Sequence, residues 1–180
     1  LKKPRRSHIG GIEMADLRRV TTQNDIETVA QLADTIWREH YTPIIGPGQV
    51  DYMLATFQSP SAIADQIGRG YEYYILADED GDKGYLALVP DPEKARLMIS
   101  KIYVHANTRA KGFGRHMLEF ADRTGRRRGF RTVWLTVNKH NADSIAWYRR
   151  NGFRTVESVV QDIGAGYAMD DYVMEKKIDA

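Results

Sequence analysis

The chain has 180 residues, of which 42% are hydrophobic and 28% charged, with a formal net charge of +2. This length and composition suit one soluble domain with its own core. No apolar run approaches the ~20 residues that a membrane span needs, so we expect no membrane partner. The nearly balanced charge does not call for a nucleic-acid partner. Without cysteine, the chain cannot form disulfides, thiolate metal sites or a cysteine nucleophile, and we expect it to work in the reducing cytoplasm.

The first eleven residues, "LKKPRRSHIGG", carry a basic cluster but no apolar segment of the kind that follows in a secretory signal. We interpret residues 1–11 as a solvated basic extension rather than a localisation or nucleic-acid patch. No internal repeat or Pro/Gly/Ser-rich linker divides the remainder. Residues 12–180 are therefore predicted to form a single domain.

The first third of that domain predicts a strand followed by helices. "MADLRRVT" alternates apolar and polar residues, which is typical of a strand. Apolar residues then recur at helical spacing over residues 25–39, and "YTPIIGPG" is expected to break that helix. Two shorter helices follow, in "QVDYMLATF" and in "SPSAIADQIGRG", where a serine precedes the helix and a glycine ends it.

The middle and the end of the chain alternate strands with two further helices. "YEYYILAD", "EDGDKG" and "YLALVP" predict a hairpin, and "ARLMISKIYVH" predicts a longer strand. The nearly continuous apolar run "TVWLTVN" favours a strand that is buried on both faces. A helix follows, with Asn141 as its N-cap and Gly152 at its C-terminal turn, and residues 153–178 predict a final pair of strands. The fold class is α/β.

The glycine-rich stretch "TRAKGFGRHML", residues 108–118, lies between a predicted strand and a predicted helix. The first backbone N–H groups of that helix lack internal partners, and the helix dipole adds positive potential, so the junction suits a phosphate. Gly112 and Gly114 allow close approach to the backbone, with Arg109, Lys111 and Arg115 beside them. The stretch is not a Walker A loop, and the dinucleotide-binding fingerprint fails because Met117 stands where its third glycine belongs.

The pattern R-x-x-G-x-G in this loop resembles the acetyl-CoA loop of the GNAT superfamily of N-acetyltransferases. A second stretch, "LTVNKHNADSIAWYRRNGF", is similar to that superfamily's L-x-V-x-x-x-N-x-x-A-I-x-x-Y-x-x-x-G-F, with Ser144 departing from the usual alanine. The resemblance extends over nearly the whole chain from Ile12. It implies a mixed, mostly antiparallel central sheet with a splayed parallel strand pair and flanking helices.

The resemblance also implies acetyl-CoA as co-substrate and a set of residues that bind it. Backbone groups of the strand before the loop would meet the pantetheine arm, the loop would hold the pyrophosphate, and Asn141 would reach the pantetheine from the second splayed strand. Either Lys111 or Arg115 would meet the ribose phosphate. The complete expected set is Ile102, Tyr103, Val104, Arg109, Ala110, Lys111, Gly112, Phe113, Gly114, Arg115 and Asn141.

The implied reaction is direct attack of an amine on the thioester, with Tyr148 matching the family's general acid. A backbone N–H of residues 102–104 is the natural donor to the oxyanion. Many relatives carry a glutamate on the strand before the loop as general base, but "LMISKIYV" contains no carboxylate. The base must then be another group, with Glu39, Asp51 and Glu72 as candidates, or a water chain or bulk solvent.

The acceptor is expected to be a primary amine of a small molecule, with polyamines among the candidates, because the chain is most similar to bacterial members of that type. Aromatic and acidic residues of the early helices and last strands are candidates to receive it: Trp37, Tyr41, Tyr52, Tyr172, Glu39, Asp51, Asp170 and Asp171. A non-catalytic acyl-CoA-binding module and acetylation of a protein amine remain alternatives. We also expect a homodimer. The five histidines lack metal-binding spacing, so no metal site is expected.

Overall fold

The computed structural model describes residues 15–109 and 111–178, so the predicted basic extension and Ala110 lie outside the described residues. Within this part a seven-stranded sheet has the order β1-β2-β3-β4-β5-β7-β6. β4 and β5 run parallel, and every other neighbouring pair is antiparallel. The predicted mixed α/β sheet is thereby confirmed. Its strands are β1 Asp16–Arg19, β2 Glu72–Asp78, β3 Gly81–Asp91, β4 Arg96–Val104, β5 Thr132–Asn138, β6 Arg154–Gly164 and β7 Tyr167–Lys177.

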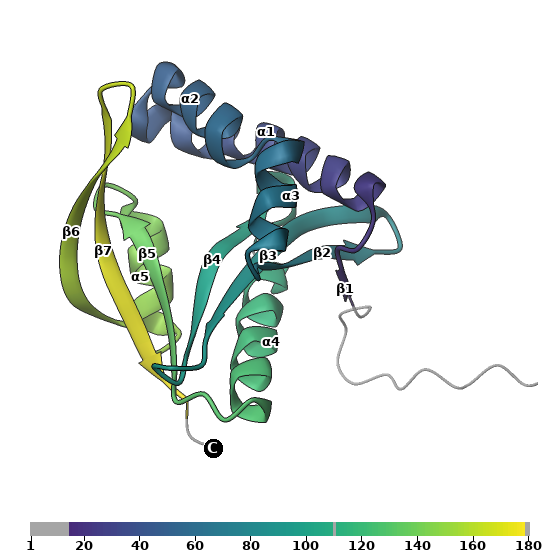
Figure 1. Ribbon diagram of the computed structural model, residues 1–180, viewed down its shortest axis with the longest axis vertical. Helices are drawn as coiled ribbons and strands as arrows, with labels where there is room; N and C mark the ends of the chain where they lie inside the picture. Colours follow the sequence, from purple (N-terminus) through teal and green to yellow (C-terminus); the bar gives the residue numbers. More distant parts are fainter. Residues whose placement is uncertain (1–14, 110, 179–180) are drawn as a thin grey trace, which may run out of the picture.

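Helices cover both faces of the sheet and divide the core into two clusters. One cluster joins the first three helices to Tyr73, Ile75 and Tyr85 of the sheet. The other joins the last two helices to the opposite face, around Leu97 and Leu135. Figure 1 shows α1, α2 and α3 gathered at one end of the molecule and α4 running along the other half. The helices are α1 Gln23–Ile45, α2 Pro47–Phe57, α3 Pro60–Gly68, α4 Phe113–Arg127 and α5 Ala142–Arg150, with a 3₁₀ turn at Ala106–Thr108.

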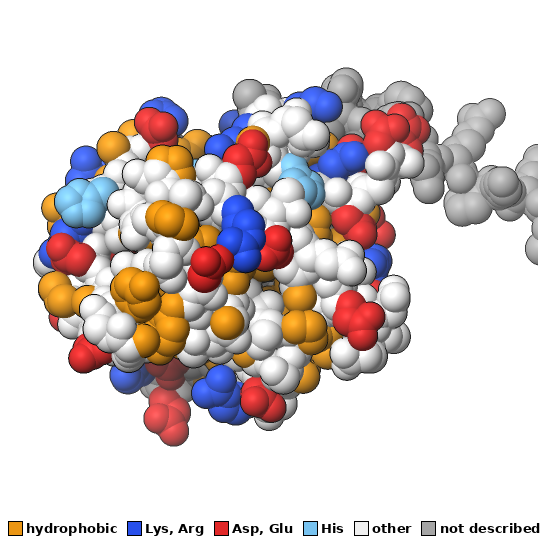
Figure 2. Space-filling view, turned by 90° about the horizontal axis from the view of Figure 1, so that it is seen from above, with side chains coloured by type: hydrophobic (Ala, Val, Ile, Leu, Met, Phe, Trp, Pro, Cys, Tyr) orange, Lys and Arg blue, Asp and Glu red, His pale blue; other side chains and the backbone are white. Residues whose placement is uncertain are grey.

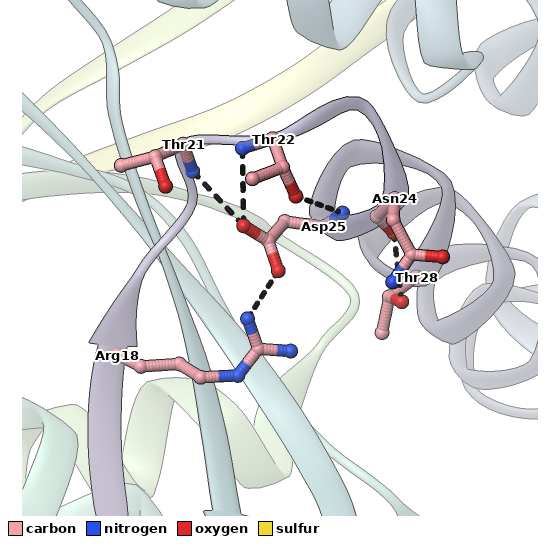
Figure 3. A network of polar contacts seen from close by, with 6 residues as sticks. All are labelled: Arg18, Thr21, Thr22, Asn24, Asp25 and Thr28. Atoms are coloured by element: carbon pink, nitrogen blue, oxygen red, sulfur yellow. Dashed lines mark hydrogen bonds and ion pairs between the residues drawn. The ribbon is translucent and has the colours of Figure 1, made fainter.

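A capping network fixes the start of α1 against β1 (Figure 3). The hydroxyl of Thr22 accepts a hydrogen bond from the backbone N–H of Asp25 at 3.1 Å. The carboxylate of Asp25 in turn accepts from the backbone N–H groups of Thr21 and Thr22, each at 3.1 Å, and pairs with Arg18. Because these groups stabilise the ionised form, the pKa of Asp25 lies well below its usual range. The network supplies partners to donors that a helix start otherwise leaves unpaired.

The expected break after residue 39 is wrong, because α1 continues to Ile45 with Pro43 inside it. A proline costs a helix one backbone hydrogen bond, which the flanking turns can tolerate when other contacts hold them. Here the last turns carry Tyr41 and Ile45, which pack against the core. The helix ends instead at Gly46, whose φ of 82° few other residues adopt readily.

β4 and β5 pair only over their first three residues, from Arg96 opposite Thr132 to Met98 opposite Trp134. Figure 1 shows the two strands diverging toward their ends. A bulge in β4 accompanies the separation, since Ile99 pairs with Leu88 and Lys101 with Ala87, which leaves Ser100 between them. The splayed strand pair that the resemblance implied is therefore present.

The β6–β7 hairpin reaches back to α2, although the two elements are far apart in the sequence (Figure 1). The side-chain amide of Gln49 donates to the carbonyl of Ala168 at 2.9 Å. The hydroxyl of Tyr52 donates to the carbonyl of Ile163 at 2.5 Å. These contacts fix the hairpin beside the first two helices, on the side of the sheet where α1–α3 pack.

Seen from above α1 and α2, the surface mixes positive and negative side chains without a large area of one sign (Figure 2). This mixture agrees with the nearly balanced composition of the chain. Over the described ranges, no helix is both long enough and apolar enough to cross a membrane.

Candidate active site

A cavity of about 580 Å³ opens between the diverging ends of β4 and β5. Its walls come from β4, the following loop, the first turn of α4, β5, α5 and the end of α1. Most of the residues that the sequence analysis selected lie here together. They are Ile102, Tyr103, Val104, Arg109, Gly112, Phe113, Gly114, Arg115, Asn141 and Tyr148.

The loop at the start of α4 fits an anion. Gly112 adopts the left-handed conformation, with φ of 82°, and no side chain caps the helix that follows. The first N–H groups of α4 are therefore left for a ligand at the positive end of the helix dipole. Arg109 and Arg115 line the same cavity and add positive charge. Lys111 is exposed and is not among the lining residues, while Ala110 lies outside the described residues.

Gly114 meets a structural requirement besides any ligand contact. A Cβ atom at this position would lie 3.1 Å from the ring of Trp147 on α5, which is closer than nearly all such contacts. The second glycine of the loop thus lets the start of α4 approach Trp147 of α5 closely. Its φ is not positive, unlike that of Gly112.

Asn141 links the start of α5 to α1. Its side-chain oxygen accepts from the backbone N–H of Ser144 at 3.4 Å, as the predicted N-cap does. Its amide nitrogen lies 3.1 Å from Nε2 of His40, which also lines the cavity. Burial and the nearby Arg109 guanidinium lower the pKa of His40, so its imidazole is mostly neutral at pH 7.

Tyr148 is buried on α5 and packs between the rings of Trp147 and Phe153. Burial raises the pKa of its phenol, which therefore remains protonated at neutral pH. The hydroxyls of Tyr41 and Tyr103 lie 3.3 Å apart beside the same cavity. Helix α1 and strand β4 thus bring two further phenols to the end of α5.

A second cavity, of about 450 Å³, lies between the first three helices, the splayed strands and the β6–β7 hairpin. Apolar and aromatic side chains, including Trp37, Met53 and Phe57, form much of its wall. The two cavities meet where β4 and β5 separate. They share the lining residues Tyr41, Ser100, Lys101, Tyr103, Thr136 and Val137.

Lys101 is a buried cation at this junction. Its ammonium donates to Oε1 of Gln66 and to the hydroxyl of Tyr73, each at 2.5 Å. The Tyr73 hydroxyl itself donates to the same Gln66 oxygen at 2.6 Å. Burial and the positive charge of Arg69 lower the pKa of Lys101 to about 7. The residue therefore exchanges between charged and neutral forms near neutral pH.

Asp171 of β7 is the carboxylate of the second cavity. It is 4% exposed, and its Oδ1 has no hydrogen-bond partner among the described residues. Burial raises its pKa to about 6, and the negative charge of Asp170 acts in the same direction. The Thr136 hydroxyl and the Lys139 ammonium partly oppose that rise.

The three acidic residues that the sequence suggested as bases do not line either cavity. Asp51 and Arg38 form an exposed ion pair with N–O separation of 2.5 Å. Glu72 pairs with Arg128 at 2.9 Å at the far side of the sheet from α1–α3. Glu39 is exposed on α1. Of the predicted acceptor-side residues, Trp37, Tyr41 and Asp171 line the second cavity, whereas Tyr52, Asp170 and Tyr172 do not.

The sequence analysis missed Lys101, His40, Thr136 and Trp147 as cavity residues. One signal was available for Lys101, because a lysine inside the apolar run "LMISKIYV" must be either buried or on an exposed edge. His40 and Thr136 gave none. They become part of the site only because α1 and β5 converge on β4 in the fold.

The fold combines a sheet split between two parallel strands with a cavity at the split and a loop suited to phosphate. The model of the Acetyltransferase (GNAT) family matches residues 30–153, and the chain belongs to this family. It is accordingly an acyltransferase, with acetyl-CoA as the co-substrate of its family. The loop and cavity described above fit that co-substrate.

The chain is also similar to named acetyltransferases and to solved structures. The chain is 22% identical over 170 residues to spermidine N(1)-acetyltransferase of Thermoplasma acidophilum, covering 92% of this chain and 98% of that protein. It is 37% identical over 81 residues to streptothricin acetyltransferase of Streptomyces lavendulae, but this match covers only 44% of the chain and 43% of that protein. The PaiA N-acetyltransferase of Thermoplasma acidophilum, solved with coenzyme A, has a TM-score of 0.74 at 19% identity, covering 91% of this chain and 99% of that one. At 19% identity, this similarity shows that the two chains share a fold and nothing beyond that.

Proposed function

We propose that the protein transfers the acetyl group of acetyl-CoA to a primary amine of a small molecule by direct attack, with Tyr148 as general acid. The observation that carries the proposal is the meeting of two cavities at the splayed strands, where they share Tyr41 and Lys101. A donor in the first cavity and an acceptor in the second would face each other there. Binding both reactants in this way removes most of the entropic cost of bringing them together.

The donor side of the proposal rests on the loop residues. The N–H groups at the start of α4, with Arg109 and Arg115, would hold the pyrophosphate. The pantetheine arm would lie along the edge of β4 beyond Met98, where pairing with β5 has ended. Backbone groups of residues 102–104 on that edge would contact the arm and the developing oxyanion.

Tyr148 suits a proton donor because it lines the donor cavity and its phenol is protonated at neutral pH. When the carbon–sulfur bond breaks, the leaving thiolate would take this proton. A general acid contributes about 10²- to 10⁴-fold to a rate. We therefore expect Tyr148→Phe to lower kcat by at least ~10²-fold while acetyl-CoA still binds.

The size of the second cavity supports a small molecule as the acceptor. This cavity has a volume of about 450 Å³ and is bordered by the first three helices and the β6–β7 hairpin. Two relatives are named for small amines, spermidine and streptothricin. An amine that also carries a carboxylate is a further candidate, since Lys101 and Arg69 are cations of the cavity wall. A protein amine would have to enter the same cavity.

Release of the coenzyme A thiol, measured with a panel of amines, tests the proposal. The panel contains polyamines, streptothricin-type antibiotics, amino acids and peptides. Tyr148→Phe is compared with Tyr74→Phe, since Tyr74 is a buried tyrosine that lines neither cavity. If acetyl-CoA binds but no amine raises turnover, the chain is a non-catalytic acyl-CoA-binding module. If Tyr148→Phe retains the wild-type kcat, Tyr148 is not the acid.

A further inference from the structure

The strand that precedes the glycine loop lacks a carboxylate, yet direct attack requires an amine that has lost its proton. A free alkylamine is protonated at neutral pH, because its pKa is about 10. Such an ammonium needs both a counter-charge when it enters an apolar cavity and a group that takes its proton. An acidic side chain in the wall of the acceptor cavity would meet both needs.

Among the described residues, Asp171 is the one acidic residue that lines the second cavity. The first cavity also has one described acidic residue in its wall, Asp143, which is exposed at the start of α5. Asp171 comes from β7, where the strand register places it opposite Asn138 at the end of β5. That end of β5 is the part that diverges from β4. The fold therefore places a carboxylate of the last strand in the wall of the second cavity, beside Thr136, which lines both cavities.

The surroundings of Asp171 leave it available to a ligand. Its Oδ1 is buried and has no hydrogen-bond partner among the described residues. An unpaired buried acceptor of this kind is costly to the fold, and the cost is recovered when a donor reaches it. The neighbouring Asp170 is instead paired with Lys139 and lines neither cavity.

We propose that Asp171 receives the acceptor's primary ammonium in the second cavity and accepts its proton, in place of the missing strand glutamate. This inference rests on the proposed acetyl transfer. The ammonium gives one proton to the Asp171 carboxylate, which passes it to solvent. The neutral nitrogen then bonds to the thioester carbon. When the carbon–sulfur bond breaks, Tyr148 protonates the sulfur, and the second proton of the nitrogen restores the phenol.

The groups around Asp171 determine the pH at which it works. Asp170 and Lys139 flank it with opposite charges, Thr136 contacts it from β5, and Tyr41 faces it from α1. With a pKa of about 6, the carboxyl is ionised above that pH and can take a proton there. Activity is therefore expected to fall below about pH 6.

Lys101 is the competing proton acceptor, because its pKa of about 7 leaves much of it neutral. Its Nζ, however, is already hydrogen-bonded to Gln66 and Tyr73. In addition, Lys101 in either protonation state offers no negative charge to an incoming ammonium, whereas the Asp171 carboxylate does. If Asp171 takes the proton, kcat/KM should fall below about pH 6, and if Lys101 takes it, kcat/KM should fall below about pH 7. Variants at each residue distinguish the two cases.

The test measures kcat/KM against pH, from 5 to 9, for wild type, Asp171→Asn, Asp170→Asn and Lys101→Met with the best amine of the panel. Asp171→Asn should lose at least ~10²-fold in kcat/KM and lack the limb near pH 6, with the KM for acetyl-CoA unchanged. Asp170→Asn should keep the rate at pH 8 and move the limb to lower pH, because it removes a like charge. Unfolding curves verify that each variant is folded.

The outcomes separate the two proposals. An active wild type whose acid limb survives in Asp171→Asn overturns the role of Asp171 and leaves the acetyltransferase function in place. A limb that disappears in Lys101→Met alone assigns the proton acceptor to Lys101 and overturns the inference as well. A wild type that acetylates no amine overturns the proposed function and this inference with it.

Discussion

Replacing Asp171 by asparagine should change the pH dependence of stability, independently of any substrate. Burial raises the pKa of this carboxyl from 3.8 to about 6 in the folded chain. In the unfolded chain the carboxyl ionises near its ordinary value. Between these two pH values the folded chain holds a proton that the unfolded chain has released, so wild-type stability falls as the pH rises.

The size of this effect follows from the same pKa. Each pKa unit corresponds to about 1.4 kcal/mol, so ionised Asp171 costs the folded chain roughly 2–3 kcal/mol. Solvent that enters the cavity screens part of the cost, and we expect about 2 kcal/mol. Asparagine has nearly the same shape and cannot ionise. Relative to wild type, Asp171→Asn should therefore gain about 2 kcal/mol between pH 4 and pH 7 and no more above that range.

Urea unfolding followed by tryptophan fluorescence at several pH values measures this difference. The comparison between variant and wild type cancels the titration of other carboxyls, provided that they do not interact with Asp171. Asp170→Asn is the matched control, since Asp170 is paired with Lys139 and less buried. A difference between Asp171→Asn and wild type that stays constant from pH 4 to pH 7 would refute the reasoning, because it would mean that Asp171 is not desolvated in the folded chain.

Three further changes are predicted. Lys101→Met should raise thermal stability most below pH 7, where the folded wild type carries a buried charge. The gain should shrink as the pH rises toward 10.5, because the folded chain loses the lysine proton near pH 7 while the unfolded chain keeps it. Asp25→Asn should lower the free energy of unfolding by about 2 kcal/mol at pH 7. The loss should be smaller below pH 4, because the contacts of the Asp25 carboxylate stabilise the folded chain fully only where the carboxyl of the unfolded chain is also ionised. Gly84→Ala should lower Tm sharply, because its Cβ would lie 2.1 Å from the carbonyl oxygen of Tyr103. Gly68→Ala is the control and should not lower Tm, since a Cβ there would have no neighbour within 4 Å. Equal Tm values for the two variants would contradict the close approach of β3 and β4.

The donor side could be predicted from the sequence because its parts are close together in the chain. The strand, the glycine loop and α4 are consecutive, so the N–H groups that suit a phosphate follow from local structure alone. Tyr148 follows the N-cap Asn141 by seven residues, about two helical turns, and that spacing brings both to the same side of α5. The paired strands after α5 were predicted for the same reason, since alternation and turn residues are local signals.

The sequence named Tyr41 and Asp171 among eight acceptor-side candidates, but only the tertiary structure separates those that line the second cavity from those that do not. Tyr41 belongs to this site only because α1 continues beyond residue 39, which the nearby proline and glycines argued against. Lys101 faces the second cavity because a bulge at Ser100 changes which side chains of β4 point to each face. Asp171 meets them through the antiparallel register of β7 with β5 and through the splay of β4 from β5. Pairing between distant strands and local changes of register leave little trace in a single sequence, because they depend on which segments pack together. The sequence by itself therefore predicted a phosphate-binding loop, and its resemblance to the GNAT superfamily indicated acetyl-CoA as the donor, whereas only the folded chain places Asp171, and neither Asp51 nor Asp170, in the wall of the second cavity.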